Sequence, residues 1–269
     1  MKNFIHRITT LSVVLIFFLS VSVKAQPAQP PGSSDDLPWW KTALVDAGGA
    51  LGGAGAVGGF IGPGSITPGG WVALGGGAIL GGASASVAVT SNSSSVEHAE
   101  EAQVIKSALN SGNSRSSRTS KTTTNQNDQI GQLHNLIISE YFDKHNTFNR
   151  DTFYKFVIND ERVFPRGTTP ILTKKDYDQI VQESMYLRVP NNNDMIIEFI
   201  LKHLPDTVDT QKFRDYLILL LNSNTVDSFN ANLDFVEGEV RSDNDLSERD
   251  SFAMDAFFST ARNSAQLWK

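Results

Sequence analysis

The sequence contains no cysteine. A chain without cysteine forms no disulfide bonds, has no thiol nucleophile, and lacks the residue that a bacterial lipid anchor requires. Basic residues are also in the minority, because 23 Lys and Arg stand against 29 Asp and Glu, which gives a formal net charge of −6. This acidic balance argues against nucleic acid as the main partner.

The short motifs of common catalytic and cofactor sites are absent too. There is no H-E-x-x-H, no G-x-S-x-G, no G-x-x-x-x-G-K and no dinucleotide fingerprint placed between a strand and a helix. His98 and Glu101 share one helix face, but a di-metal site needs a second such pair and none follows. We therefore expect no metal, no cofactor and no catalytic activity. The alternative is an enzyme in the C-terminal helices that uses His134 or His145 with carboxylates, although His134 is expected to be a structural histidine.

Charge is missing over a long segment, from Ala47 to Val96. Residues 41–89, which overlap most of this segment, hold 16 of the 21 glycines. The prolines and glycines of residues 63–70 interrupt any helix or strand, and they separate two apolar arms, residues 41–62 and 71–89. These features predict an antiparallel, glycine-rich helical hairpin over residues 35–90.

Small residues recur in both arms with spacings of four and three. This spacing places one small residue per turn on one helix face, so we expect two bare seams that face each other and bring the backbones close together. The predicted seams are Gly48, Gly52, Gly55, Gly59 and Gly62 in the first arm, and Gly77, Gly81, Ser84 and Ala88 in the second.

The lengths of the arms, 22 and 19 residues, are close to the ~20 that cross a bilayer. Trp39, Trp40 and Trp71 begin the arms, where interfacial anchors belong. Asp46 lies about one turn inside the first arm and is expected to complement the helix N-terminus. Membrane insertion is the preferred interpretation. The alternatives are a helical pair packed within protein and a loose glycine-rich linker.

The chain begins with the features of a secretory signal peptide over residues 1–25: a basic start, an apolar run from Leu11 to Leu19, and small residues before Gln26. Its removal lowers the formal net charge to −9. A proline-rich spacer occupies residues 26–34. We therefore expect an exported protein of the periplasm, the outer envelope or the extracellular space, with membrane association as a further expectation.

After the arms the composition becomes polar. A short polar helix is predicted over residues 91–112 and a flexible Ser/Thr/Asn linker over residues 113–127. Residues 128–269 show helical periodicity and should fold as a separate multi-helix domain, which makes the whole chain all-α. Seven helices are expected in this domain. Their predicted start and stop signals include caps at Asn149, Thr173 and Asp209 (or Thr210), an N-terminal Asp245-x-x-Glu248 before the last helix, and an end to the helix 228–237 near Gly238.

The chain resembles a loose group of uncharacterised exported proteins of the Bacteroidota. These proteins combine a signal peptide, a D-x-x-G-A-x-x-G glycine-zipper hairpin, and a helical tail with a G-x-L-H-N motif and an aromatic last helix. The hairpin alone is also similar to the glycine-zipper segments of small membrane-permeabilising bacteriocins. The matching residues are Asp46, Gly49, Ala50 and Gly53, then Gly131, Leu133, His134 and Asn135, and then Ala261, Ser264 and Trp268.

The sequence thus predicts a non-catalytic envelope protein. Its hairpin associates with a bilayer or with another copy of the chain, and its helical domain binds a protein partner. The first alternative is a secreted, bacteriocin-like antagonist that permeabilises membranes through the same hairpin. The second is an enzyme hosted in the helical domain.

Overall fold

The computed structural model describes residues 37–61, 68–90, 128–145, 148–166, 172–188, 193–243 and 246–268. Within these ranges all regular elements are helices and none is a strand, which confirms the all-α class. The expected signal peptide, proline-rich spacer, polar helix, Ser/Thr/Asn linker and centre of the glycine-proline turn lie outside the described residues.

Nine α-helices and one 3-10 helix occupy the described part of the chain. They are α2 (Trp39–Ile61), α3 (Pro68–Thr90), α5 (Asp128–Lys144), α6 (Arg150–Ile158), α7 (Lys174–Met185), η1 (Tyr186–Arg188), α8 (Asn193–Leu201), α9 (Thr210–Leu221), α10 (Val226–Asp243) and α11 (Glu248–Leu267).

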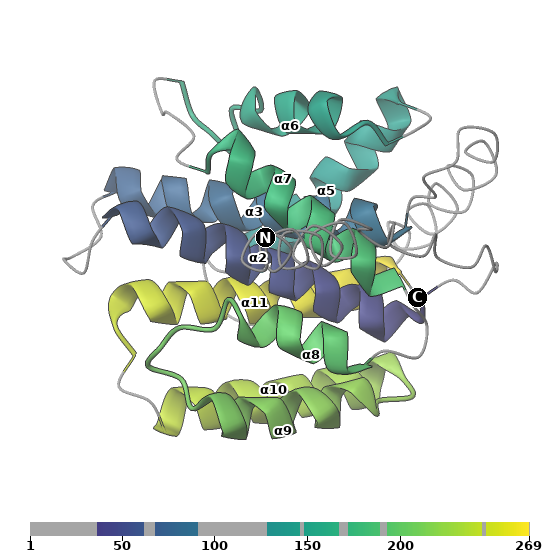
Figure 1. Cartoon of the computed structure of the whole chain (residues 1–269), viewed down its shortest axis with the longest axis vertical. Helices are drawn as coiled ribbons and strands as arrows, with labels where there is room; N and C mark the ends of the chain where they lie inside the picture. Colours follow the sequence, from purple (N-terminus) through teal and green to yellow (C-terminus); the bar gives the residue numbers. More distant parts are fainter. Residues whose placement is uncertain are drawn as a thin grey trace, which may run out of the picture. The chain divides into compact units, whose positions relative to one another are not determined.

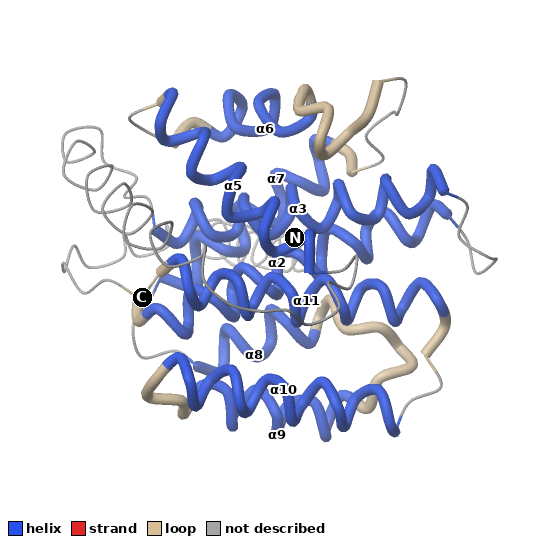
Figure 2. Tube along the Cα trace, turned by 180° about the vertical axis from the view of Figure 1, so that it is seen from behind, coloured by secondary structure: helices blue, strands red, loops and turns tan. Residues whose placement is uncertain are grey.

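Helices α2 and α3 lie at the centre of this arrangement (Figure 1). Helices α5, α6 and α7 lie on one side of them, and α8 to α11 lie on the other (Figure 2). Helix α2 packs against α11 and α8, while α3 packs against α7 and α5. The apolar residues of both central helices are consequently buried, among them Leu44, Leu51, Leu74 and Leu80 at 0% exposure.

The two central helices approach each other through backbone atoms. A Cβ atom added to Gly77 would lie 2.6 Å from the carbonyl oxygen of Gly53, and one added to Gly49 would lie 2.6 Å from that of Gly81. Since Gly49 meets Gly81 and Gly53 meets Gly77, the helices run antiparallel. Only glycine permits this distance, because any side chain at these four positions would overlap the facing helix.

Local signals place most outer helices where the sequence predicts them. Asn149, Thr173 and Asp209 are the N-caps of α6, α7 and α9, and each accepts a hydrogen bond from the backbone N–H three residues later. The last helix is an exception, because it begins after Ser247, whose hydroxyl caps it, and not with the predicted Asp245-x-x-Glu248 signal. Each cap satisfies a backbone donor that the first turn of a helix leaves without a partner.

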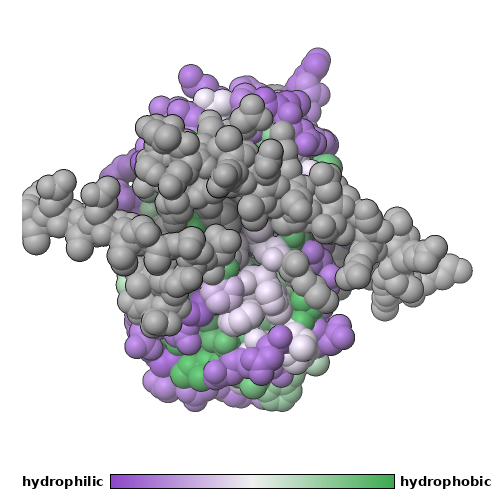
Figure 3. Space-filling view, turned by 90° about the vertical axis from the view of Figure 1, so that its right-hand side faces the viewer, coloured by the Kyte–Doolittle hydropathy of each residue, from purple (hydrophilic) through white to green (hydrophobic). Residues whose placement is uncertain are grey.

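The prediction that a helix ends near Gly238 is wrong. Helix α10 continues through Gly238 to Asp243, and a Cβ atom at Gly238 would have nothing within 4 Å. The helix continues past Gly238 because Val236 and Val240, on either side of it, are both buried, and the burial of this apolar face stabilises the helix. Helices α9 and α10 together expose Ile218, Leu219 and Phe235. Figure 3 shows hydrophobic surface at this lower end of the molecule.

The central pair and the C-terminal helices belong to one compact unit, which runs from Asp36 to Lys269. The sequence instead suggests a hairpin tethered to a separate domain. The difference has a physical reason, because the apolar faces of α5, α7, α8 and α11 are directed at α2 and α3 and not only at one another. The glycine-rich pair is the core on which the other helices pack.

Candidate functional site

Four helices meet at one buried polar cluster. It is formed by Asp46 of α2, Ser86 of α3, His134 and Asn135 of α5, and Ser264 and Trp268 at the end of α11. Five of these six residues belong to the motifs on which the resemblance rests. We call this set the Asp46 cluster.

Asp46 is the centre of the cluster and has 0% exposure. Its Oδ2 atom accepts hydrogen bonds from Ser86 Oγ at 2.8 Å, from Trp268 Nε1 at 2.9 Å and from the Ser264 hydroxyl. Its Oδ1 atom is buried and has no hydrogen-bond partner among the described residues. One carboxylate oxygen therefore connects α2 to α3 and α11.

The expectation that Asp46 complements a helix N-terminus is wrong. Helix α2 begins at Trp39 and has no acidic residue in its first turn, so Asp46 lies about two turns inside it. At that depth the positive end of the helix dipole has little effect. Side-chain donors from α3 and α11 satisfy the carboxylate instead.

His134 is also fully buried, and its Nε2 atom lies 4.0 Å from Asp46 Oδ2. This nitrogen has no partner of hydrogen-bonding geometry among the described residues. The Nδ1 atom lies 2.9 Å from the side-chain oxygen of Asn135, whose amide donates to the carbonyl of Asn263 in α11 at 2.9 Å. His134 and Asn135 thus join α5 to the cluster.

Burial controls the protonation of both ionisable groups. Loss of water raises the pKa of Asp46 from 3.8 to about 7, although the hydrogen bonds from Ser264, Ser86 and Trp268 oppose this rise. Burial lowers the pKa of His134 from 6.5 to about 4, against smaller opposing contributions from Asn135 and the backbone of Gly82. Both groups are accordingly neutral between about pH 4 and pH 7.

The contact of α5 with α11 depends on Gly131. A Cβ atom there would lie 2.6 Å from Asn263 Nδ2 and would overlap the backbone of Ser259. The Gly131 N–H donates to Ser259 Oγ at 3.1 Å. The glycine of the G-x-L-H-N motif therefore permits the close approach that brings His134 and Asn135 to the cluster.

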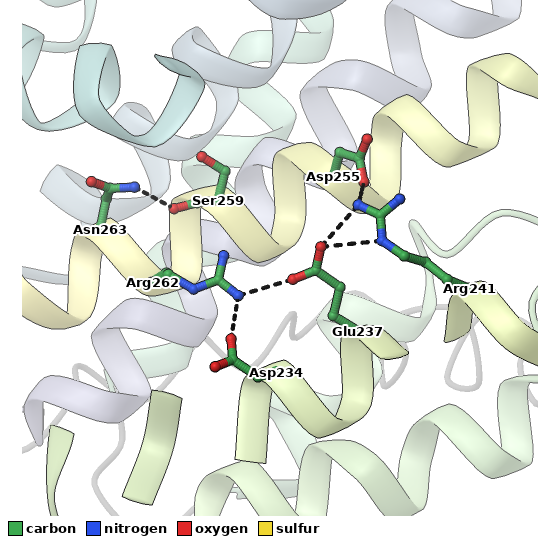
Figure 4. A network of polar contacts seen from close by, with 7 residues as sticks. All are labelled: Asp234, Glu237, Arg241, Asp255, Ser259, Arg262 and Asn263. Atoms are coloured by element: carbon green, nitrogen blue, oxygen red, sulfur yellow. Dashed lines mark hydrogen bonds and ion pairs between the residues drawn. The ribbon is translucent and has the colours of Figure 1, made fainter. Parts of the chain in front are cut away.

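A second polar network joins α10 to α11 (Figure 4). Glu237 accepts hydrogen bonds from Arg241 at 2.8 Å and from Arg262 at 2.9 Å. Arg262 also donates to Asp234 at 2.7 Å, and Arg241 to Asp255. The two arginines bind all three carboxylates, so this network connects α10 to α11.

The predicted seam of the first arm is expected to face the second arm, but its described glycines face α8 and His203, which follows α8. A Cβ atom at Gly48 would lie 2.8 Å from Phe199 of α8, and one at Gly52 would lie 3.2 Å from the His203 ring. Gly55 is open, with nothing closer than the His203 carbonyl at 4.0 Å. The surroundings of Gly59 and Gly62 lie outside the described residues.

In the second arm, Gly77 and Gly81 do face α2. Ser84 and Ala88 are buried, and the Ser84 hydroxyl donates to the carbonyl of Leu80 within α3. The seam of α2 that meets α3 is the one next to the predicted seam, formed by Gly49 and Gly53. Both faces of α2 carry glycine, because α3 and α8 each approach it closely.

The tryptophans predicted as interfacial anchors lie as follows. Trp39 is partly buried and packs edge-on against Trp40 at 5.4 Å and against Phe229 of α10 at 5.6 Å. The Nε1 atom of Trp40 is buried without a hydrogen-bond partner among the described residues. The side chain of Trp71 lies outside the described residues. In this structure Trp39 therefore contacts protein.

Most residues of the Asp46 cluster belong to motifs that are visible in the sequence, but no motif points to Ser86. Ser86 is one of several serines in Gly82–Ser94, and its partner Asp46 is 40 residues away. Within the described part of the chain, no group of three or more His, Asp or Glu side chains is placed to hold a metal ion. The arrangement can hold four helices together, and it can exchange a proton at Asp46 or His134.

One described helix segment, Val72–Val89 of α3, is long and apolar enough to cross a membrane, with a mean hydropathy of 1.7. Of this segment, 89% is buried inside the protein, and core helices of soluble proteins have the same length and composition. Comparisons of the chain with protein-family models, with curated proteins and with solved structures find no match.

Proposed function

We propose that the protein is a non-catalytic, exported envelope protein whose glycine-rich helices form a protein-packed core and whose outer helices bind a partner. The observation that carries the proposal is the Asp46 cluster. A catalytic carboxylate needs access to a substrate, whereas Asp46 has 0% exposure and its Oδ2 atom is occupied by three donors from α3 and α11. Such a group is suited to holding helices in register.

The packing of the central pair supports the same proposal. Gly48 and Gly52 bring α8 close to one face of α2, and Gly49 and Gly53 bring α3 close to another. A hairpin that served only as an anchor would need just one such face. Glycine also costs about 0.8–1 kcal/mol per residue in a helix relative to alanine, so close packing on both faces has to offset it.

Hydrogen exchange followed by mass spectrometry tests this proposal in the mature protein, with and without lipid vesicles. We expect α2 and α3 to exchange as slowly as any part of the chain, and we expect vesicles to change nothing. Faster exchange in α8 and α11 on addition of vesicles, with α2 and α3 still protected, would show that the outer helices open. Fractionation of the native cell with sequencing of the mature N-terminus tests export.

A second candidate function is membrane association or permeabilisation by α2 and α3. The favouring observation is that these helices contact each other through their own backbones, at Gly49, Gly53, Gly77 and Gly81, so the pair is complementary without the rest of the fold. Helix α3 also has the length and hydropathy to span a bilayer. In this candidate the outer helices must separate from the pair before it inserts.

A reversible disulfide distinguishes the two candidates. A Cβ atom at Gly48 lies 2.9 Å from Cγ1 of Ile200 and 2.8 Å from the Phe199 ring, so Gly48→Cys with Ile200→Cys, combined with Phe199→Leu to make room, can link α2 to α8. The chain has no other cysteine, so no other disulfide can form within one molecule. Insertion predicts that the reduced protein releases dye from vesicles and that the oxidised protein does not. Absence of leakage from wild type and from both forms of the variant dismisses permeabilisation.

A further inference from the structure

An open hollow of about 400 Å³ lies where the C-terminal end of α5 meets α6. It is lined by Lys144 and His145 at the end of the first of these elements, and by Thr152, Lys155, Phe156, Asn159 and Asp160 from the second and the residues that follow it. The volume is within the range of sites that hold small molecules, about 300–1,000 Å³. The hollow is separate from the Asp46 cluster.

The two lysines of the hollow differ from most cations of the protein. Ten described arginines and lysines lie within 4.0 Å of a carboxylate, in keeping with the acidic composition. Within the same described part of the chain, Lys144 and Lys155 form no ion pair. Two unpaired ammonium groups at the edge of one hollow create a local positive potential.

The acidic residue that lines the hollow, Asp160, is paired with Arg162 and not with either lysine. Asp160 accepts hydrogen bonds from Arg162, at 2.9 Å from Nε to Oδ1 and 2.5 Å from a terminal nitrogen to Oδ2. Arg162 also binds Glu140 at 2.8 Å. These bonds hold the pKa of Asp160 below its ordinary value, with Arg162 as the main cause. Neither carboxylate forms an ion pair with Lys144 or Lys155, and these two lysines with Arg162 outnumber the two carboxylates by three charges to two, so the hollow keeps a net positive charge.

Aromatic packing gives the hollow a firm apolar wall. The Phe156 ring packs edge-on against Tyr141 at 5.5 Å, and Tyr141 lies 4.6 Å from the His145 ring. Lys144 Nζ lies 4.9 Å from the centre of the Phe156 ring. The Thr152 hydroxyl adds a hydrogen-bonding group. Positive charge, an aromatic face and a hydroxyl therefore converge within one small volume.

We propose that this hollow binds a small organic anion that carries a carboxylate or phosphate group next to a flat apolar ring. Lys144 and Lys155 bind the charged group, and Phe156 contacts the ring. Charge-assisted hydrogen bonds to the two ammonium groups supply most of the affinity, since they are stronger than neutral ones. Carboxylates and phosphates share this chemistry, and a comparison of the two shows which the site prefers.

The test is an NMR titration of the mature protein with benzoate and with phenyl phosphate. We expect saturable shifts of the amides of Thr152, Lys155 and Phe156, and weaker binding at higher salt. Benzamide has the ring without the charge, and inorganic phosphate has the charge without the ring, so both should bind more weakly. Equal affinity for benzamide would overturn the anion site, and equal affinity for inorganic phosphate would overturn the role of Phe156.

Matched lysine variants complete the test. Lys144→Ala and Lys155→Ala should each weaken binding of the better anion by at least about tenfold. Lys175→Ala is the control, because Lys175 is exposed and does not line the hollow. All three positions are exposed, so the fold should be retained, and circular dichroism checks this. No saturable binding, or the same loss in the Lys175 variant, would refute the proposal.

Discussion

At the scale of single residues, glycine has opposite roles at neighbouring positions of α2. Gly53 touches the backbone of α3, where any side chain would overlap the carbonyl oxygen of Gly77. Gly55, only two residues later, is exposed and faces open space. Spacing alone does not distinguish them, because the pattern of small residues puts Gly55 on the predicted seam and leaves Gly53 off it. The structure assigns the close contact to Gly49 and Gly53.

The first prediction compares Gly53→Ala with Gly55→Ala. The methyl group at position 53 must push α2 and α3 apart, so we expect a loss of at least about 2–3 kcal/mol in the free energy of unfolding. At position 55 alanine meets no neighbour and is the better helix former, so a gain of up to about 1 kcal/mol is expected. Urea unfolding of both variants measures the two changes in the free energy of unfolding. A larger loss of stability at position 55 than at position 53 would contradict the contacts of the structure and support the seam predicted from the sequence.

The second prediction concerns the pH dependence of stability at Asp46 and His134. Folded Asp46 keeps its proton up to about pH 7, but unfolded Asp46 loses it near pH 4, so this residue makes stability fall as pH rises between these values. Unfolded His134 takes up a proton below about pH 6.5, and the folded form takes it up only near pH 4. His134 therefore makes stability rise with pH over that interval. The two slopes, each about 1.4 kcal/mol per pH unit, cancel.

Single substitutions should separate these slopes. Compared with wild type, Asp46→Asn is expected to gain stability as pH rises from about 4.5 to 6.5, because the rise in stability from His134 is then no longer cancelled by Asp46. His134→Asn is expected to lose stability over the same interval, because only Asp46 remains. Urea unfolding at three or more pH values measures both trends. If the two variants follow the wild-type pH profile, the residues do not titrate as their burial implies.

At the scale of elements, α11 is a third central helix that the sequence did not reveal. It packs against α2, α5, α10 and α3, and most of its residues from Phe252 to Ala265 are buried. Its charged residues suggest an ordinary outer helix. Asp255 and Arg262, however, belong to the network with α10, while small residues such as Ala256, Ala261 and Ser264 pack inward.

The third prediction follows from the path of α10 through Gly238. A glycine that ends a helix adopts a left-handed conformation, and alanine there would cost about 1 kcal/mol. In this structure Gly238 lies inside the helix with open space around it. Gly238→Ala should therefore raise the free energy of unfolding by about 0.5–1 kcal/mol. The sign of the change, measured by thermal or urea unfolding, distinguishes a continuous helix from one that stops at residue 238.

At the scale of the whole molecule, local patterns sufficed for the helices but not for their assembly. The all-α class and the caps at Asn149, Thr173 and Asp209 follow from short-range chemistry that any one segment contains. The contact of Gly49 with Gly81, or of Asp46 with Ser264, depends on how segments 32 and 218 residues apart meet. No periodicity within one helix contains that information. For this reason the sequence suggested a tethered domain where the structure has a shared core.

The fourth prediction tests this shared core by dividing the chain. Residues 128–269 alone would leave the faces of α5, α7, α8 and α11 that pack on α2 and α3 exposed to water. This fragment should fail to form a cooperatively folded state, and it should give poorly dispersed NMR spectra and bind hydrophobic dyes. The chain from residue 37 to the end retains every described helix and should unfold in one transition.

Native-like dispersion and cooperative unfolding of the 128–269 fragment would show that α2 and α3 are an addition to an independent domain. A fragment that folds only when a peptide of residues 37–90 is supplied would instead show that the glycine-lined pair is the core that the other helices require.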